Sequence, residues 1–515
     1  MGLSTATTSS ERIKNMKKII VFLLLAAMLM TIVACSTPSD SSDSNTTPPT
    51  ADGGETTPPS GAEETTPAET TPPEPKEPET PEEMLALFEQ TDYNKQAFNI
   101  LLCNKYNGSI SIQQAAEEYT GNVVNDALYE RDMALESYFN IDLVYNIAED
   151  NGQLTTIARN TAEAGLSDYD LIFGGMRASA AQLAVQAYLT DLNSLDALDL
   201  DKAYWNQNIK KDLEIVNKMY FATGDITTRY MSAANLIAFN EQMVKDYGYG
   251  NLYQKVYDGT WTIDELGKMI KDKSQDLNQD EKLVVSQDFV AMSGASDAWY
   301  GFIVGTGTKA LVRNADGIPV VNNTESCYNV IDKLASFLTT PDAQIQDVSY
   351  GSSAAFKEER AMFLLSAACD LQIIADWDGY GILPIPKYDV NQDAYYSLAN
   401  PYISTAVFIL RCSKDANKSA AIMEAMAAVS SLTSAPAQYE NIMQLRQAKN
   451  EDSMKCLKIA TEATTFDFTY IYQWGNQLTT IMRKAIMDGE AFASAFAATE
   501  ESVNAQILKA IAKMR

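Results

Sequence analysis

Short apolar runs alternate with amphipathic helical segments soon after residue 95. Residues 98–102, 141–145 and 170–173 are short runs of largely apolar residues, a pattern typical of buried strands. Apolar residues recur at helical spacing from Val124 to Phe139, and a second helix is predicted over about 153–164. Short buried strands that alternate with helices predict an α/β fold with a mainly parallel sheet covered on both faces.

The same order of strand and helix recurs after residue 235. Residues 236–239 predict a strand, followed by a helix to about Tyr247 and another over 261–270. Residues 305–310 imitate a glycine-rich dinucleotide fingerprint, but the turn sequence 314–317 follows where a helix should start. We therefore expect a hairpin there.

Trp261 illustrates how a conspicuous aromatic residue can be structural. Thr262 and Glu265 have the spacing of a capping box, while Trp261 and Leu266 occupy the two positions of a hydrophobic staple. The pattern favours a role for Trp261 in fixing the start of this helix over a role in stacking on a ligand.

The N-terminal stretch has the order of a secretory signal. Basic residues precede the apolar run 19–34, which ends in small residues directly before Cys35. The run is shorter than a typical membrane-spanning helix. We interpret 1–34 as a lipoprotein signal peptide and Cys35 as the lipidated residue, which predicts anchoring on the extracytoplasmic face of the cell membrane.

Residues 35–94 read as a tether that begins at the lipidated cysteine. From Ser36 to about Glu83 the sequence consists mostly of Ser, Thr, Pro, Gly and acidic residues, with repeated Thr-Thr-Pro units. Such a composition buries too little apolar surface to offset its ordering entropy, so we expect this segment to be disordered.

Composition excludes several functional classes. The formal charge of −29 over 515 residues disfavours a nucleic-acid partner, because nucleic-acid affinity comes largely from cationic contacts. The chain has no histidine, which removes His general bases, Ser-His-Asp triads and most zinc sites. Beyond Cys35, five cysteines remain without C-x-x-C spacing, and their apolar contexts favour small core residues over disulfides. We expect a protein that is not an enzyme and needs no cofactor.

Five strings, in this order behind the lipoprotein signal, resemble one family. They are Asn125-Asp126-Ala127-Leu128-Tyr129-Glu130-Arg131, Asp168-Tyr169-Asp170-Leu171-Ile172, Tyr220-Phe221-Ala222-Thr223-Gly224-Asp225-Ile226, Gly259-Thr260-Trp261-Thr262-Ile263-Asp264-Glu265-Leu266 and Tyr380-Gly381-Ile382-Leu383-Pro384-Ile385-Pro386. Residues 95–515 thus resemble the family 1 extracellular solute-binding proteins, lipid-anchored receptors of ABC importers that include the maltose-binding type.

The resemblance implies a two-lobed, type II periplasmic-binding-protein-like α/β fold with strands that cross between the lobes. Lobe 1 would comprise 95–230 and 384–445, and lobe 2 would comprise 234–381 and 446–515. A monomer would hold a solute in the cleft and present its closed form to an ABC permease, because a ligand that contacts both lobes binds the closed state better.

Sugar sites combine aromatic platforms with carboxylate, amide and guanidinium groups, and two aromatic clusters offer them. Tyr472 and Trp474 fall where the family often places a stacking aromatic; the alternative is packing beneath the last helices. Asp297 precedes the adjacent pair Trp299 and Tyr300, of which one ring would face the cleft.

Polar candidates come from other loops. Arg177 follows a predicted strand and two glycines at the carboxyl end of the sheet, where ligands of open α/β folds bind, but a solvated helix start explains it equally well. Asp225 and Arg229 fit an ion pair as well as ligand contacts, and Trp377 fits hinge packing or solvent exposure. The remaining candidates are Tyr106, Asn107, Asn400 and Tyr402.

A calcium-like loop is the one metal candidate. Asp276, Asn278 and Asp280 alternate as oxygen ligands do in such loops, but Glu281 replaces the turn glycine and Gln287 stands at the twelfth position. These departures disfavour a metal.

The leading hypothesis is a receptor that captures a carbohydrate, with an oligosaccharide favoured, and delivers it to an ABC importer unchanged. A second hypothesis keeps the fold but changes the ligand to a peptide, polyamine or anion, or couples the receptor to a sensor. A remote third is a glycan hydrolase with two carboxylates, for which no spacing singles out a pair.

Overall fold

The computed structural model describes residues 77–514 except 104, 107–109, 112, 228–230, 348 and 445–449. The predicted signal peptide, Cys35 and most of the predicted tether lie outside the described residues. Helix α2 (Pro81–Leu85) belongs to the stretch that we assigned to the tether, yet Leu85 is 1% exposed and packs in the core. The folded part therefore begins before residue 95, because Leu85 supplies apolar surface that the preceding residues lack.

The first sheet has four strands in the order β14-β5-β1-β4. Its strands are β1 (Gln96–Cys103), β4 (Ile141–Ala148), β5 (Leu171–Gly175) and β14 (Thr405–Phe408). Strand β1 runs parallel to β4 and to β5, whereas β14 pairs with β5 in the antiparallel direction. The three strands predicted from apolar runs in this region are confirmed.

The second sheet has five strands in the order β10-β7-β11-β6-β12. Its strands are β6 (Asn235–Asn240), β7 (Val290–Ala295), β10 (Ala343–Asp347), β11 (Ala361–Ala367) and β12 (Tyr380–Pro384). Strand β6 is antiparallel to both neighbours, while β10 and β11 are parallel to β7. Both sheets are thus mainly parallel, as predicted, with one reversed strand each. Along the chain, β6 is the first strand of the second sheet after β5. Strand β14 is the first strand of the first sheet after β12.

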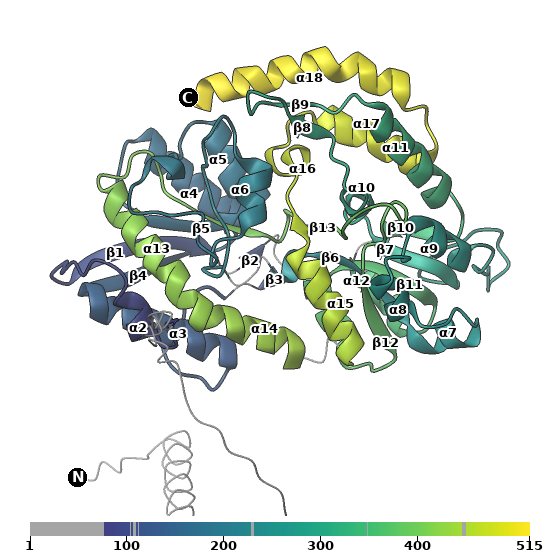
Figure 1. Cartoon of the computed structure of the whole chain (residues 1–515), viewed down its shortest axis with the longest axis horizontal. Coiled ribbons are helices and arrows are strands. Elements are labelled where there is room, and N and C mark those ends of the chain that lie inside the picture. Colours follow the sequence, from purple (N-terminus) through teal and green to yellow (C-terminus); the bar gives the residue numbers. More distant parts are fainter. Residues whose placement is uncertain are drawn as a thin grey trace, which may run out of the picture. The chain divides into compact units, whose positions relative to one another are not determined.

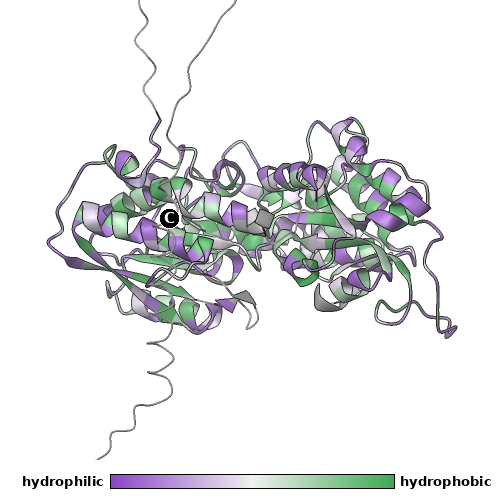
Figure 2. Cartoon of the chain, turned by 90° about the horizontal axis from the view of Figure 1, so that it is seen from below, coloured by the Kyte–Doolittle hydropathy of each residue, from purple (hydrophilic) through white to green (hydrophobic). Residues whose placement is uncertain are grey.

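Helices pack with each sheet, and Figure 2 shows hydrophobic residues concentrated in the strands. The helices beside the first sheet are α2, α3 (Val123–Phe139), α4 (Asn151–Glu163), α5 (Ala181–Val185), α13 (Ala416–Leu432) and α14 (Ser434–Gln444). Those that follow or cover strands of the second sheet are α7 (Glu241–Asp246), α8 (Leu252–Tyr257), α9 (Ile263–Ile270), α10 (Tyr300–Gly305), α11 (Glu325–Leu338), α12 (Ser349–Lys357) and α15 (Glu451–Glu462). Three 3-10 turns are η2 (Leu192–Ser194), η3 (Met231–Ala233) and η4 (Ala368–Ile374).

Several elements join the two halves of the folded part, each of which is built around one of the two sheets. Strand β13 (Ser397–Leu398) pairs with β15 (Thr464–Thr465), and α6 (Gln207–Leu213) packs against β15. Figure 1 shows α16 (Phe468–Tyr472) between α5 and α17 (Asn476–Asp488), both of which it contacts. Helix α18 (Ala493–Met514) packs against α5, α17 and β9 (Pro319–Val321). The C-terminal segment therefore contacts elements associated with each sheet.

Local details agree with the sequence pattern. Trp261 is fully buried, and its indole N–H donates to the Pro384 carbonyl at 2.9 Å. The Thr262 hydroxyl accepts from the Glu265 backbone N–H at 3.3 Å and caps α9, whereas the Glu265 carboxylate binds Lys255 at 2.8 Å. Trp261 is thus structural. The Thr262 cap is present, and the Glu265 carboxylate binds Lys255.

The predicted hairpin is present, with β8 (Leu311–Arg313) antiparallel to β9 (Pro319–Val321). A minor hairpin joins β2 (Lys105–Tyr106) to β3 (Ile110–Ser111). None of the five described cysteines is in a disulfide, and all but Cys412 are buried, which confirms their interpretation as core residues. Within the described ranges, no helix combines the length and the apolar character that a membrane span needs.

Candidate functional site

Tyr470, on α16, is the centre of a group of polar and aromatic side chains from four segments of the chain. Its ring stacks on that of Tyr300, with centroids 4.6 Å apart and planes 10° from parallel. Its hydroxyl donates to the backbone carbonyl of Asp297 at 2.8 Å. The ring of Tyr402 meets it edge-on at 5.8 Å. We call Tyr470, Tyr300, Tyr402, Arg177, Asp297 and Asn400 the Tyr470 cluster.

Arg177 brings the first sheet to this cluster. It lies in the π-helical turn η1 (Met176–Ala180), which directly follows β5 at the carboxyl end of that strand. Its guanidinium carbon is 4.7 Å from the ring centroid of Tyr402 and 5.5 Å from that of Tyr470, and it donates to the Tyr470 carbonyl. Arg177 is half-buried and forms no ion pair with any carboxylate in the described part of the chain. Among the described residues, the partners of its charge are the ring faces of Tyr402 and Tyr470 and the Tyr470 carbonyl.

Asp297 and Asn400 fix two loops against each other. The Asn400 amide donates to the Asp297 carboxylate at 3.1 Å, and its side-chain oxygen accepts from the Tyr402 backbone N–H at 3.1 Å. Asn400 is buried, whereas Asp297 and Tyr402 are half-buried. The cluster thus combines aromatic rings, a carboxylate, an amide and a guanidinium.

Asp467 holds Tyr470 and Tyr300 of the cluster by hydrogen bonds. Its carboxylate caps α16 by accepting from the Tyr470 backbone N–H at 2.9 Å, and it accepts the Tyr300 hydroxyl at 3.2 Å. Its second oxygen, Oδ2, is buried without a hydrogen-bond partner among the described residues. Burial raises the pKa of Asp467, against the lowering effect of Lys309.

Tyr472 and Trp474 lie in an aromatic stack next to the cluster. Their rings are 4.6 Å apart and 20° from parallel, and Phe468 stacks on Trp474 at 6.1 Å. Both are buried, at 6% and 4% exposure. Within the described residues, the Trp474 indole N–H has no acceptor although it is buried. Their role as ligand contacts stays a prediction.

The other predicted residues are dispersed. Trp299 is 4% exposed and packs edge-on against Tyr300 at 5.3 Å. Trp377 packs on Phe356 and Tyr380 in a separate apolar cluster beside the second sheet. Asp225 is half-buried, and its backbone N–H donates to the Tyr204 carbonyl. Asn107, Arg229 and the side chain of Tyr106 lie outside the described residues.

In the calcium-like loop, side-chain oxygens accept hydrogen bonds from the backbone N–H groups of the loop itself. Asp276 accepts from the N–H groups of Gln279 at 2.6 Å and Glu281 at 2.8 Å, and Asn278 accepts from that of Asp280 at 3.0 Å. In the described part of the chain, no three His, Cys, Asp or Glu residues form a group able to hold a metal ion.

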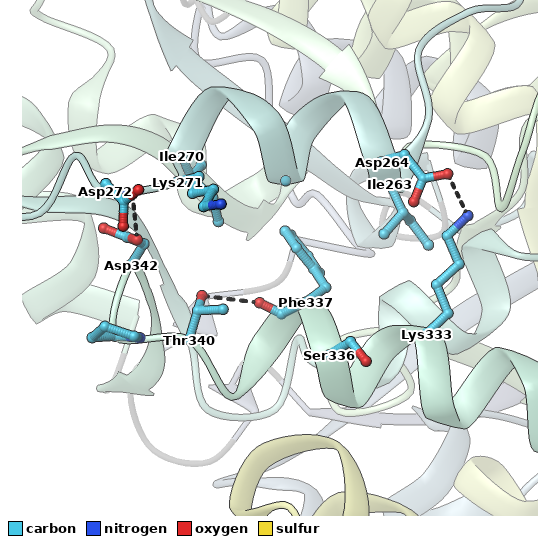
Figure 3. Close-up of a pocket in the computed structure, with 12 residues that line it drawn as sticks. Ile263, Asp264, Ile270, Lys271, Asp272, Lys333, Ser336, Phe337, Thr340 and Asp342 are labelled. Atoms are coloured by element: carbon cyan, nitrogen blue, oxygen red, sulfur yellow. Dashed lines mark hydrogen bonds and ion pairs between the residues drawn. The ribbon is translucent and has the colours of Figure 1, made fainter.

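A cavity of about 420 Å³ lies between α9 and α11, away from these residues (Figure 3). Ile263, Ile270 and Phe337 line it, and Lys333 spans one end to bind Asp264 at 2.7 Å. None of the predicted ligand residues lines this cavity. It gives no support to a solute site there.

Sequence reasoning missed Asp467 and did not single out Tyr470 within its aromatic string. A usable signal was present, because Asp467 stands three residues before Tyr470, which is the spacing of an N-cap and the N–H that it accepts. That Tyr470 rather than Tyr472 meets Arg177 depends on the turn of a short helix.

No family model and no curated protein sequence matches the chain. Solved structures do match its fold. The galacto-N-biose/lacto-N-biose I-binding protein of the ABC transporter from Bifidobacterium longum, in complex with lacto-N-biose, is 13% identical with a TM-score of 0.51 and covers 81% of this chain and 98% of its own.

Two further structures give similar values. Maltose-binding periplasmic protein MalE from Listeria monocytogenes, in complex with maltose, is 11% identical with a TM-score of 0.51 over 81% of this chain and 98% of its own. UspC from M. tuberculosis is 12% identical with a TM-score of 0.50 over 79% and 99%. The chain has the two-lobed α/β fold of these three structures.

Proposed function

We propose that this protein is a lipid-anchored extracytoplasmic receptor that captures an oligosaccharide and delivers it to an ABC permease without chemical change. The observation that carries the proposal is the convergence of Arg177, Asp297, Asn400 and Tyr402 on Tyr470. These residues come from segments that are far apart in the chain and follow strands of different sheets.

The chemistry of the Tyr470 cluster suits a sugar. Carbohydrates offer apolar C–H faces, which pack on aromatic rings, and hydroxyl groups, which both donate and accept hydrogen bonds. Half-buried Tyr402 supplies a ring, Arg177 supplies donors and the Asp297 carboxylate supplies an acceptor. Two of the similar structures, named above, were solved with disaccharides bound, which supports the same ligand class here.

The capture mechanism follows from two lobes that both contact the solute. We assign 95–230 and 384–445 to lobe 1, together with α2, which packs against α3 and α13, and 234–381 and 446–515 to lobe 2. A ligand between Arg177 of lobe 1 and Asp297 of lobe 2 binds the closed form better than the open form, so it shifts the population toward closure. The permease then recognises the closed shape of a monomer.

Anchoring is the second part of the proposal. Cleavage before Cys35 and acylation of the new N-terminus by two or more chains would give stable attachment to the membrane. The Thr-Pro-rich stretch after it would keep the receptor near its permease while leaving it free to move. Mass spectrometry of the mature N-terminus tests this part, and an unlipidated terminus elsewhere contradicts it.

Isothermal titration against a panel of neutral and acidic oligosaccharides tests the capture function. We expect at least one saccharide to bind to wild-type protein and to bind much more weakly to Arg177→Ala and Tyr402→Ala. Absence of binding to every saccharide contradicts the proposal. Chemical turnover of a bound sugar would favour the hypothesis of a glycan hydrolase instead.

One observation favours a second candidate function, the capture of an anionic solute. Arg177 has no carboxylate partner among the described residues, so an acidic group on the ligand would complete an ion pair there. Titration with uronic acids and simple carboxylates separates the two candidates, because the first predicts tight binding of neutral sugars and the second does not.

A further inference from the structure

A second cavity lies where elements of the two halves of the folded part meet. Its volume is about 530 Å³, and its lining comes from α6, from α10 and the loop after it, from residues 394–396, and from α15 and β15. We call it the α6–α10 cavity. No residue of the Tyr470 cluster lines it. The volume is in the range of pockets that hold small molecules.

Two tyrosine rings give this cavity an aromatic wall. Tyr395 and Tyr396 are half-buried, and each hydroxyl is engaged, Tyr395 donating to the Val256 carbonyl at 3.0 Å and Tyr396 to Asp393 at 3.3 Å. Gly307, at φ 74°, passes close to the Tyr396 ring, since a Cβ there would lie 3.2 Å from Cε2. The anchored hydroxyls hold both rings in place, so the rings are pre-organised as platforms.

The charges around the cavity cancel. Two lysines and two carboxylates line it, Lys211, Lys309, Asp212 and Glu462. Lys309 binds Asp212 at 2.5 Å, and Glu462 lies 3.6 Å from Lys458 on the same helix. A charged ligand would find no net opposite charge, whereas a neutral ligand with hydroxyl groups would find donors and acceptors beside aromatic faces.

We infer that the α6–α10 cavity is a second binding site, distinct from the Tyr470 cluster, for a neutral mono- or disaccharide. This inference does not depend on which solute the Tyr470 cluster captures. Asp212, which lines the cavity, is also linked to the segment before α16 that contains Asp467. Asp212 uses its second oxygen to accept from the Phe466 backbone N–H at 2.9 Å, and the next residue, Asp467, caps α16.

Because Asp212 holds the segment that positions α16, occupancy of the cavity and of the Tyr470 cluster should be energetically coupled. Coupling between two binding sites is reciprocal by thermodynamic necessity. A saccharide in the cavity is therefore expected to change the affinity of the Tyr470 cluster for its solute, and the solute to change the affinity of the cavity by the same factor.

The test is calorimetric titration of the protein with neutral monosaccharides and disaccharides. Ala394, an exposed residue of the lining, provides a blocking variant, Ala394→Trp, and Ala497, exposed on α18, provides the matched control Ala497→Trp. We expect at least one saccharide whose binding disappears in Ala394→Trp but persists in Ala497→Trp and in Arg177→Ala. Tyr396→Ala should weaken that binding about tenfold, equivalent to about 1.4 kcal/mol. Tyr396→Phe keeps the ring but loses the hydrogen bond to Asp393, so it should weaken binding much less.

Absence of any saccharide binding that Ala394→Trp removes overturns the inference. Binding that depends only on Arg177 overturns it while leaving the proposed function intact, whereas binding that depends only on Ala394 and Tyr396 supports it and contradicts the proposed function. Circular dichroism and thermal unfolding of each variant identify any loss caused by misfolding. If Ala394→Trp misfolds, Tyr396→Ala against Tyr396→Phe decides.

Discussion

The rings of Tyr300 and Tyr470 lie face to face with centroids 4.6 Å apart, and one buried carboxylate, that of Asp467, contacts both residues. Tyr300 begins the helix after β7, and Tyr470 lies near the C-terminus. The stack thus joins the second sheet to the segment whose backbone carbonyl receives Arg177 from the first sheet. This relationship makes the Tyr470 cluster sensitive to changes in several distant residues.

Replacement of Arg177 should impair binding more than folding. Arg177→Ala is expected to weaken solute binding about tenfold to a hundredfold, because hydrogen bonds to charged groups contribute about 1.5–3 kcal/mol. Arg177→Lys should not restore it, since an ammonium group lacks the planar face that packs on Tyr402. Titration calorimetry measures the affinity. Arg159→Ala, another half-buried arginine, is the control, and equal losses in both variants would contradict a specific role.

Asp467 should make stability depend on pH. Its pKa is raised by burial above the ordinary value of about 3.9, so its stabilising contribution is complete below that value and is lost as pH rises through the folded-state pKa. Asp467→Asn keeps a capping oxygen but does not ionise. We expect the unfolding free energy of Asp467→Asn, relative to wild type, to rise as the pH is raised above about 4.

Urea unfolding at several pH values measures this effect. Asp415 caps α13 by accepting from the Lys418 N–H at 3.0 Å and is exposed, so Asp415→Asn is the matched control. A flat difference between wild type and Asp467→Asn across this pH range would show that the buried carboxylate does not titrate there.

Trp261 should affect folding and not binding. The side chain is fully buried and hydrogen-bonded to the Pro384 carbonyl. Trp261→Ala is expected to lower the free energy of unfolding by about 3–5 kcal/mol, as large-to-small core substitutions do. Trp261→Phe should cost less but still lose the hydrogen bond. Denaturant unfolding and calorimetry of the folded variants check this, and weakened binding with unchanged stability would show that Trp261 is a ligand contact.

Two glycines should respond in opposite directions to alanine. A Cβ on Gly381 would lie 2.1 Å from the Tyr253 hydroxyl and 2.5 Å from the Phe239 ring, so Gly381→Ala should lower the unfolding free energy by about 1–3 kcal/mol. A Cβ on Gly267, inside α9, would meet Phe337 at an ordinary 3.5 Å, so Gly267→Ala should raise it by about 0.5–1 kcal/mol. Thermal unfolding compares the two, and a neutral Gly381→Ala would mean that β12 and α8 separate easily.

Apolar periodicity was sufficient for the individual elements. The strands at 98–102 and 236–239, the helix at 261–270 and its cap all appear where local pattern and capping chemistry place them, because burial of one face and satisfaction of terminal N–H groups are local requirements. The predictions of a lipoprotein signal and of a tether, and the absence of histidine, likewise rest on the sequence alone.

The site needed the tertiary structure. Five of the predicted ligand residues, Arg177, Asp297, Tyr300, Asn400 and Tyr402, meet around Tyr470, whereas Trp377 belongs to a separate apolar cluster. In the sequence, Arg177 and Trp377 each had a structural alternative, and the choice between Trp299 and Tyr300 was open. Which side chains converge depends on how β5, β7 and α16 are placed relative to one another, and that placement is set by long-range packing that no local pattern specifies.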